Sequence, residues 1–179
     1  MRPRALRVVL GLTAVAGWAL PGTAIAAGSQ ASCTFTSPMH FSPGISAGDG
    51  TGLRYASDAD FSGAERGTVA CTGIIGGHRT TGPGTFGFTG KWTEGDCLAN
   101  KGAGRYSFTL PTADGTKQFA GRYMEERIGF NGTVKGAQPE GTFAGAFHIV
   151  PTGTLMNAET CEGKPITQAS LLFIGVLSG

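Results

Sequence analysis

The strongest constraint on the fold is a repeated alternation of large apolar side chains with small or polar ones. In the stretch "TFGFTGKWT", Phe86, Phe88 and Trp92 share one parity, and Thr89 and Lys91 take the other. A period of two is typical of a β-strand with one buried face. Such runs, one of them apolar on both faces, cover residues 32–36, 67–75, 85–93, 104–110, 117–124, 128–135, 142–150 and 166–177, and residues 52–57 would make a ninth.

These runs predict an all-β protein, an antiparallel β-barrel of about eight strands. A two-sheet β-sandwich is the alternative, but sequential hairpins suit a closed barrel. Asp114-Gly115 and Asn131-Gly132 are predicted hairpin turns. Glycines inside the predicted strands also favour the barrel, because they let strands bend or make room for a large aromatic side chain opposite. They are Gly87, Gly90, Gly121, Gly145 and Gly175.

The N-terminal segment predicts a secretory signal peptide at residues 1–26. Arg2, Arg4 and Arg7 precede an apolar run, and Ala24 and Ala26 fit the small-x-small pattern before a cleavage site. Its removal would leave 153 of the 179 residues, and the formal charge would change from +2 to −1 because three of the 14 basic residues and no acidic one are lost. We expect a secreted, extracellular protein of one domain, residues 27–179, with no membrane span after cleavage. No basic run or stripe occurs, so nucleic acid is not an expected partner.

Four cysteines lie in the predicted mature chain, with no CxxC spacing. An even number of cysteines in an exported protein predicts two disulfides. We favour Cys33 with Cys71, both in β-like runs, and Cys97 with Cys161, both in polar loops. The other two connectivities stay open.

Residues 37–66 are rich in Gly, Ser, Asp and Pro and predict a long loop. Within it, "SDADFSG" is similar to a fragment of a calcium-binding loop. It lacks the further acidic ligands of the complete motif, so we interpret it as an Asx-turn loop.

Several stretches of the chain are similar, in sequence and in order, to those of a known group of proteins. These are "CTFTSPMHFSPGI", "VACTG", "GPGTFGFTG", a "GDC" loop, "GAGRYSFTLPT" and a final cysteine before "PIT" and an apolar strand. In their order they resemble small secreted β-proteins of actinobacteria, a group without an established activity. The resemblance implies export and an all-β fold and adds no site. A more distant similarity, in strands of aromatic residues punctuated by glycine, is to the barrels of allene oxide cyclases and dirigent proteins.

The three histidines, His40, His78 and His148, lie in separate segments without HxH or HExxH spacing. We interpret them as surface residues and predict no metal site and no cofactor. His148 shares its parity with Ala144 and Ala146. It points outward if the aromatic face fills the interior, and inward if small residues line a wide cavity.

Acid–base chemistry has weak support in the sequence. Glu125 and Glu126 precede Arg127, and we interpret the three residues as a solvated turn with a local ion pair. Neighbouring residues of a strand point to opposite faces, which argues against a catalytic pair of carboxylates. No GxSxG motif occurs, and we assign no catalytic residue.

Four side chains are candidates for ligand binding at the mouth of the barrel: Trp92, Tyr106, Tyr123 and His148. Aromatic rings there could stack on a sugar or another flat ligand. Packing in the core is the competing interpretation for the aromatic residues. Trp92 lies near a strand end and is the aromatic residue that we most expect to be exposed.

Three functions remain open. The first is a secreted, non-catalytic protein that binds a partner protein, a glycan or a small ligand. The second is a small β-barrel enzyme of the cyclase or isomerase kind, with a cavity that holds His148 or Tyr123. The third is a structural component of the cell envelope or extracellular matrix. A large cavity with an ionisable residue inside would favour the enzyme, and a filled core would favour the other two.

Overall fold

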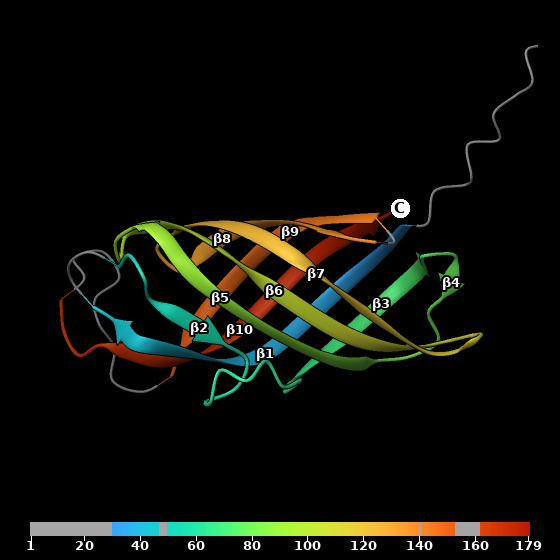
Figure 1. Ribbon diagram of the computed structural model, residues 1–179, viewed down its shortest axis with the longest axis horizontal. Helices are drawn as coiled ribbons and strands as arrows, with labels where there is room; N and C mark the ends of the chain where they lie inside the picture. The colour runs from blue at the N-terminus through green and yellow to red at the C-terminus, as the bar shows by residue number, and fades with distance from the viewer. Residues whose placement is uncertain (1–29, 47–49, 140, 153–161) are drawn as a thin grey trace, which may run out of the picture.

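A computed structural model of the chain describes residues 30–46, 50–139, 141–152 and 162–179 (Figure 1). Strands dominate it, and none of the described residues is in a helix. The predicted signal peptide at 1–26 lies outside the described residues. The ten strands are β1 (Gln30–Ile45), β2 (Arg54–Ala56), β3 (Gly67–Ile75), β4 (His78–Arg79), β5 (Gly84–Gly95), β6 (Ala99–Thr112), β7 (Gly115–Ile128), β8 (Asn131–Gln138), β9 (Gly141–Pro151) and β10 (Ile166–Ser178).

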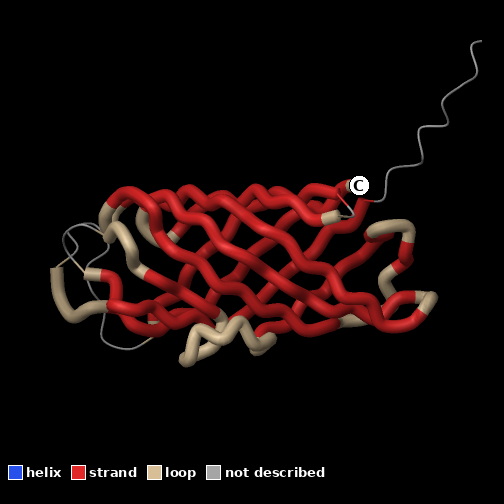
Figure 2. The backbone as a smooth tube through the Cα atoms, in the orientation of Figure 1, coloured by secondary structure: helices blue, strands red, loops and turns tan. Residues whose placement is uncertain are grey.

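The strands form one antiparallel sheet that closes on itself. From β5 to β10 each strand pairs with the next along the chain, and β10 then pairs with β1. Strand β1 pairs in turn with β2 and β3, and both of these pair with β5. A ring of hydrogen-bonded strands therefore runs through eight strands (Figure 2). The all-β prediction is confirmed, and the strands form a single sheet rather than the two sheets of a sandwich.

Aromatic side chains from four strands of the ring meet in its interior. The Phe35 ring, on β1, lies 4.8 Å from that of Phe86, 5.6 Å from that of Phe108 and 5.2 Å from that of Phe173, measured between ring centroids. All four side chains are buried. The predicted alternation thus places the aromatic face inside, because burial of these large rings is the main gain in free energy that the sheet can make on closing.

Glycines on the inner face make room for the aromatic rings of neighbouring strands. A Cβ atom at Gly90 would overlap the ring of Tyr55, and one at Gly136 would overlap the ring of Phe143. Gly121 stands in the same way against the Tyr106 hydroxyl, where a Cβ would lie 2.6 Å from the oxygen. The predicted role of strand glycines as space for aromatic side chains is therefore confirmed at Gly90 and Gly121.

Substitution of Gly136 by alanine tests this packing. We expect it to lower the free energy of unfolding by about 1–3 kcal/mol, because the new methyl group must displace the Phe143 ring. Gly82→Ala is the control, since its Cβ would meet only Pro111 Cγ at 3.4 Å. Denaturant unfolding of both variants measures the difference. Equal stability of the two variants would contradict the packing argument.

Two sequence predictions of local structure need correction. Strand β1 continues through Ile45, so residues 37–45 are strand rather than the start of a long loop. Its pairing with β10 and β2 supplies the regular hydrogen bonds that the polar composition did not suggest. The Asn131-Gly132 pair begins β8, and the turn falls on Gly129 and Phe130 instead, whereas Asp114 lies in the predicted turn before β7.

The structure contains one disulfide among the described residues, between Cys33 and Cys71, as predicted. The two cysteines are directly opposite each other on β1 and β3. Cys97 is buried. Its predicted bond to Cys161 stays a prediction, because Cys161 lies outside the described residues; two disulfides were expected and one is seen.

Candidate functional site

A small cavity lies inside the closed sheet. Its volume is about 50 Å³, which gives room for a few water molecules. Most of its wall is apolar and largely aromatic, and the polar groups on it come from three tyrosines and Glu125. The lining side chains are Phe35, Met39, Tyr55, Phe86, Phe88, Tyr106, Phe108, Tyr123, Glu125, Val134, Phe143, Phe147, Leu171, Phe173 and Leu177.

The polar side of the cavity is built on β7. Tyr123, Glu125 and Arg127 occupy alternate positions of this strand, and all three are buried. On β6, Gly102 stands directly opposite Glu125. A Cβ at Gly102 would lie 2.8 Å from Glu125 Oε1 and 3.0 Å from the Tyr55 hydroxyl, so these two oxygens converge over the glycine. The missing side chain leaves the space in which the polar groups meet.

Burial controls the protonation of Glu125. Desolvation raises the pKa of its carboxyl from 4.5 to about 7, against the opposing effects of hydrogen bonding from Tyr55 and Trp92 and of the charge on Arg127. A carboxyl with this pKa is present in both protonation states near neutral pH, so it can donate or accept a proton there. Burial likewise raises the pKa of Tyr55 and of Tyr123, and both phenols stay neutral hydrogen-bonding groups.

The Tyr55 hydroxyl is the least satisfied polar group on the cavity. Its oxygen is buried and forms no hydrogen bond of standard geometry. Burial, and after it the weaker interactions with Tyr123 and Glu125, raise the pKa of this hydroxyl. The other two tyrosines differ. The Tyr106 hydroxyl donates to Gln138 Oε1 at 3.0 Å, and the Tyr123 hydroxyl donates to the Thr89 carbonyl at 3.3 Å. A polar group of a ligand in the cavity could therefore satisfy Tyr55.

Arg127 closes the polar end of the interior. Its guanidinium lies 4.5 Å from the centre of the Trp92 ring and donates to the carbonyl oxygens of Cys97, at 3.1 Å, and of Gly129. Burial lowers the pKa of Arg127 to about 10, and Glu125 opposes that change, so the side chain stays charged at neutral pH. The guanidinium therefore places a positive charge near the Glu125 carboxyl, and this charge lowers the pKa of that carboxyl.

The structure corrects two predictions about these residues. Glu125 and Arg127 are not in a solvated turn, because β7 continues to Ile128 and carries both of them inward, while Glu126 points outward. Trp92, the aromatic residue most expected to be exposed, is only 1% exposed. The signal for Glu125 and Arg127 was available in the sequence, since they continue the parity of Phe119 and Tyr123. Tyr55, in the short run at 52–57, carried no such signal.

The candidate ligand-binding residues are divided by the fold. Tyr106 and Tyr123 line the cavity, whereas Trp92 packs beside it against Arg127. His148 is exposed on the outer face of β9, the orientation predicted if the aromatic face is inside, and its Nδ1 lies 2.9 Å from Asn131 Oδ1. A binding role of His148 would therefore have to be on the outer surface.

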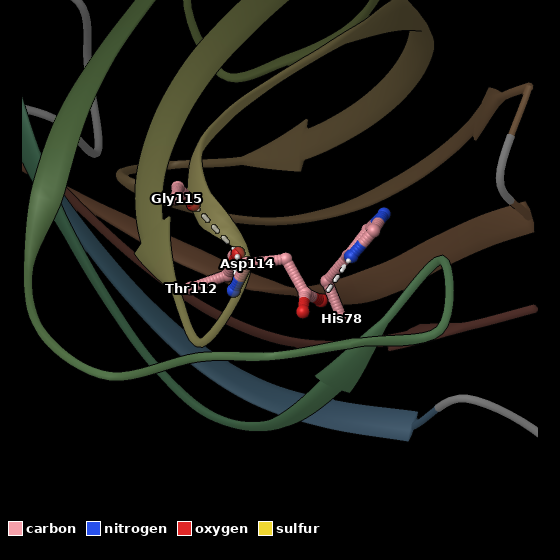
Figure 3. Close-up of polar contacts among 4 residues, drawn as sticks. All are labelled: His78, Thr112, Asp114 and Gly115. Carbon is pink, nitrogen blue, oxygen red and sulfur yellow. Dashed lines mark hydrogen bonds and ion pairs between the residues drawn. The ribbon is translucent and has the colours of Figure 1, made fainter.

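The other two histidines lie far apart along the sheet. His40 lies on β1, and His78 Nδ1 pairs with Asp114 Oδ2 at 2.8 Å. Figure 3 shows this contact beside the β6–β7 turn, where the Thr112 hydroxyl donates to the Gly115 carbonyl at 2.6 Å. Within the described ranges, no group of three or more His, Cys, Asp or Glu side chains is placed to hold a metal ion.

The "SDADFSG" segment forms a loop held by one carboxylate. Asp58 is fully buried and accepts hydrogen bonds from the backbone N–H groups of Asp60, Ser62 and Ala64 at 2.9–3.0 Å. Such bonds to following residues define an Asx-type loop, as predicted. The oxygens of Asp58 are thus occupied by the chain itself.

Comparison of the chain with protein-family models, with curated proteins and with solved structures found no match. No helix in the described part of the chain has the length and apolar character that a membrane span requires. The site therefore has to be interpreted from its own chemistry.

Proposed function

We propose that the closed sheet is a β-barrel of an exported protein that binds a small, mainly apolar molecule in its interior. The observation that carries the proposal is the cavity with aromatic walls and one polar corner, formed by Tyr55, Tyr123 and Glu125. Ligand sites in proteins have this composition, with an apolar lining and a few polar groups that fix orientation. The Cys33–Cys71 disulfide supports export, because such bonds persist in oxidising compartments.

The size of the cavity limits the ligand. About 50 Å³ is well below the volume of a typical drug-sized site, so the ligand is small or displaces an aromatic ring when it enters. Its polar group would hydrogen-bond to the Tyr55 hydroxyl, which forms no hydrogen bond of standard geometry within the protein, and to the Glu125 carboxyl. A compact aromatic alcohol or ketone has this combination of shape and polarity.

Titration with phenol, benzyl alcohol and indole tests the proposal. We expect at least one of these probes to raise the melting temperature and to change the fluorescence of Trp92, which packs beside the polar corner. Tyr55→Phe should weaken binding about tenfold, since it removes one hydrogen bond from a buried site. His148→Gln, on the outer face, is the matched control and should bind as the wild type does. If no probe binds, or if both variants lose affinity equally, the interior is not the binding site.

A second candidate function is a cyclase or isomerase that moves a proton within its substrate. The specific observation in its favour is Glu125, a buried carboxyl on the cavity whose pKa is raised to about 7. In an isomerisation, the carboxylate would take a proton from a carbon next to a carbonyl, and the carboxylic acid would return it to another carbon. Tyr55 could donate a hydrogen bond to the carbonyl oxygen as negative charge develops there.

Conversion of 3-cyclohexenone to 2-cyclohexenone, followed by ultraviolet absorbance, tests this second function. We expect Glu125→Gln to abolish any conversion above the buffer rate, while Glu126→Gln, on the outer face of the same strand, should retain it. Probe binding without conversion would leave the protein as a binding protein only.

A further inference from the structure

Five exposed cations gather on one part of the outer surface of the sheet. They lie on β2, β5, β6, β7 and β8, and we call this set the basic face: Arg54, Lys91, Arg105, Arg122 and Lys135. The pairing register brings them together, because Arg54 stands directly opposite Lys91, and Arg105 stands directly opposite Arg122. By contrast, the outward residues of β9 and β10 include no lysine or arginine.

The basic face is not neutralised by the protein. Like charges directly opposite each other on neighbouring strands destabilise a sheet. In the part of the chain that the structure describes, the ion pairs are His78–Asp114 and Lys101–Glu94, and neither includes a cation of the basic face. Glu126 is the carboxylate on the outer face of β7, and it stands opposite Lys101. Two cross-strand pairs of cations therefore face solvent with their charge available to an external anion.

We propose that the basic face binds a linear polysaccharide that bears sulfate or phosphate esters. Arginine fits such groups, because its planar guanidinium donates two parallel hydrogen bonds to their oxygens. The face crosses five neighbouring strands, a width of roughly 19 Å at the usual strand spacing, so it can contact several esters of one chain. Small residues lie between the cations, since Ala103 stands opposite Lys91 and Ala137 stands opposite Arg122.

The chemistry of the face argues against single-stranded nucleic acid. Proteins that bind single strands place aromatic side chains beside the cations, so that bases stack on them. The aromatic side chains of β2 and of β5 to β8 are buried in the interior. Phe61, in the loop after β2, lies beside the face, but the guanidinium of Arg54 already lies over its ring, 5.1 Å from the centre. The basic face therefore offers five cations and one aromatic ring that is already covered by Arg54, rather than a row of open rings, which suits a polyanionic sugar chain.

Binding to dextran sulfate and to a phosphorylated mannan, measured by calorimetry between 50 and 300 mM salt, tests the proposal and distinguishes the two esters. We expect binding to at least one of them, none to neutral dextran, and affinity that falls steeply with salt. The Arg105→Gln/Arg122→Gln double variant should lose affinity at least tenfold, and its salt dependence should decrease by about two counterions, since two contacts are removed.

The control variant is Arg66→Gln/Arg79→Gln, which makes the same change in net charge at two exposed arginines outside the basic face. We expect its affinity to stay within twofold of the wild type. The melting temperature of Arg105→Gln/Arg122→Gln should be unchanged or higher, because a repulsive pair is removed. Equal loss of affinity in the two double variants, tighter binding of a single-stranded oligonucleotide than of either polysaccharide, or no binding to either polysaccharide would overturn the proposal.

Discussion

Replacement of Glu125 by glutamine is expected to stabilise the protein above pH 7 by up to about 3 kcal/mol and to leave its stability nearly unchanged below pH 4.5. In the wild type, the pKa of Glu125 is about 7 in the folded protein against 4.5 for an ordinary glutamate. Between these two values the folded state holds a proton that the unfolded chain has released, so the wild type loses stability as pH rises. Above the pKa of the folded protein, the wild type has lost the full amount of stability, which is about 1.36 kcal/mol for each unit by which folding raises the pKa.

Glutamine does not titrate and resembles the protonated carboxyl in shape, so the variant should lack this loss. Urea unfolding of both proteins at pH 4.5, 6 and 8.5 measures the difference in the free energy of unfolding. Glu126→Gln is the matched control, because its side chain points outward from the next position of β7. A wild-type-like pH profile for Glu125→Gln would show that the carboxyl is not buried as the structure has it.

Replacement of Phe35 by alanine is expected to lower the free energy of unfolding by about 3–5 kcal/mol. Phe35 is 3% exposed and contacts rings from β5, β6 and β10, so its removal leaves a cavity at the point where rings from four strands meet. The surrounding rings are held by different strands and cannot all move into the space. The variant should therefore lose both the transfer free energy of the ring and the contacts of its neighbours.

Thermal and urea unfolding measure this effect. Met124→Ala is a suitable control, because Met124 is 68% exposed on the outer face of β7, and its removal should change the stability by less than about 0.5 kcal/mol. If Phe35→Ala costs no more than this control, Phe35 does not occupy the centre of the core.

Much of the fold could be predicted from local patterns. The alternation in β5 and β9 identified which residues share a face, and the β-like runs around Cys33 and Cys71 suggested their disulfide. These predictions succeed because side-chain parity and strand propensity are properties of the local chain. Strand β1 was predicted too short, because its prolines, serines and Gly44 suggested a loop. Met39 and Phe41 nevertheless continue the inward parity of Phe35, and pairing with β10 and β2 holds this half as strand.

The candidate site was harder to predict. The charges of Glu125 and Arg127 suggested a solvated turn, but the parity that they share with Tyr123 takes them inside, where Gly102 leaves space for the carboxyl. Tyr55 reaches the same place from a strand of three residues that is distant in sequence. The basic face could not be predicted from the sequence either, because its cations are single residues on five strands. Only the pairing register brings them together.

The sequence by itself determined an all-β chain and the two faces of its strands, and it favoured the pairing of Cys33 with Cys71 that the structure shows. The tertiary structure alone decided that the aromatic face is the interior, that His148 is therefore outside, and that Glu125, Tyr55 and Tyr123 meet at one cavity. The physical reason is that parity depends on the backbone of one strand, whereas the choice of inner face and the meeting of distant residues depend on how the whole sheet closes to bury its largest side chains.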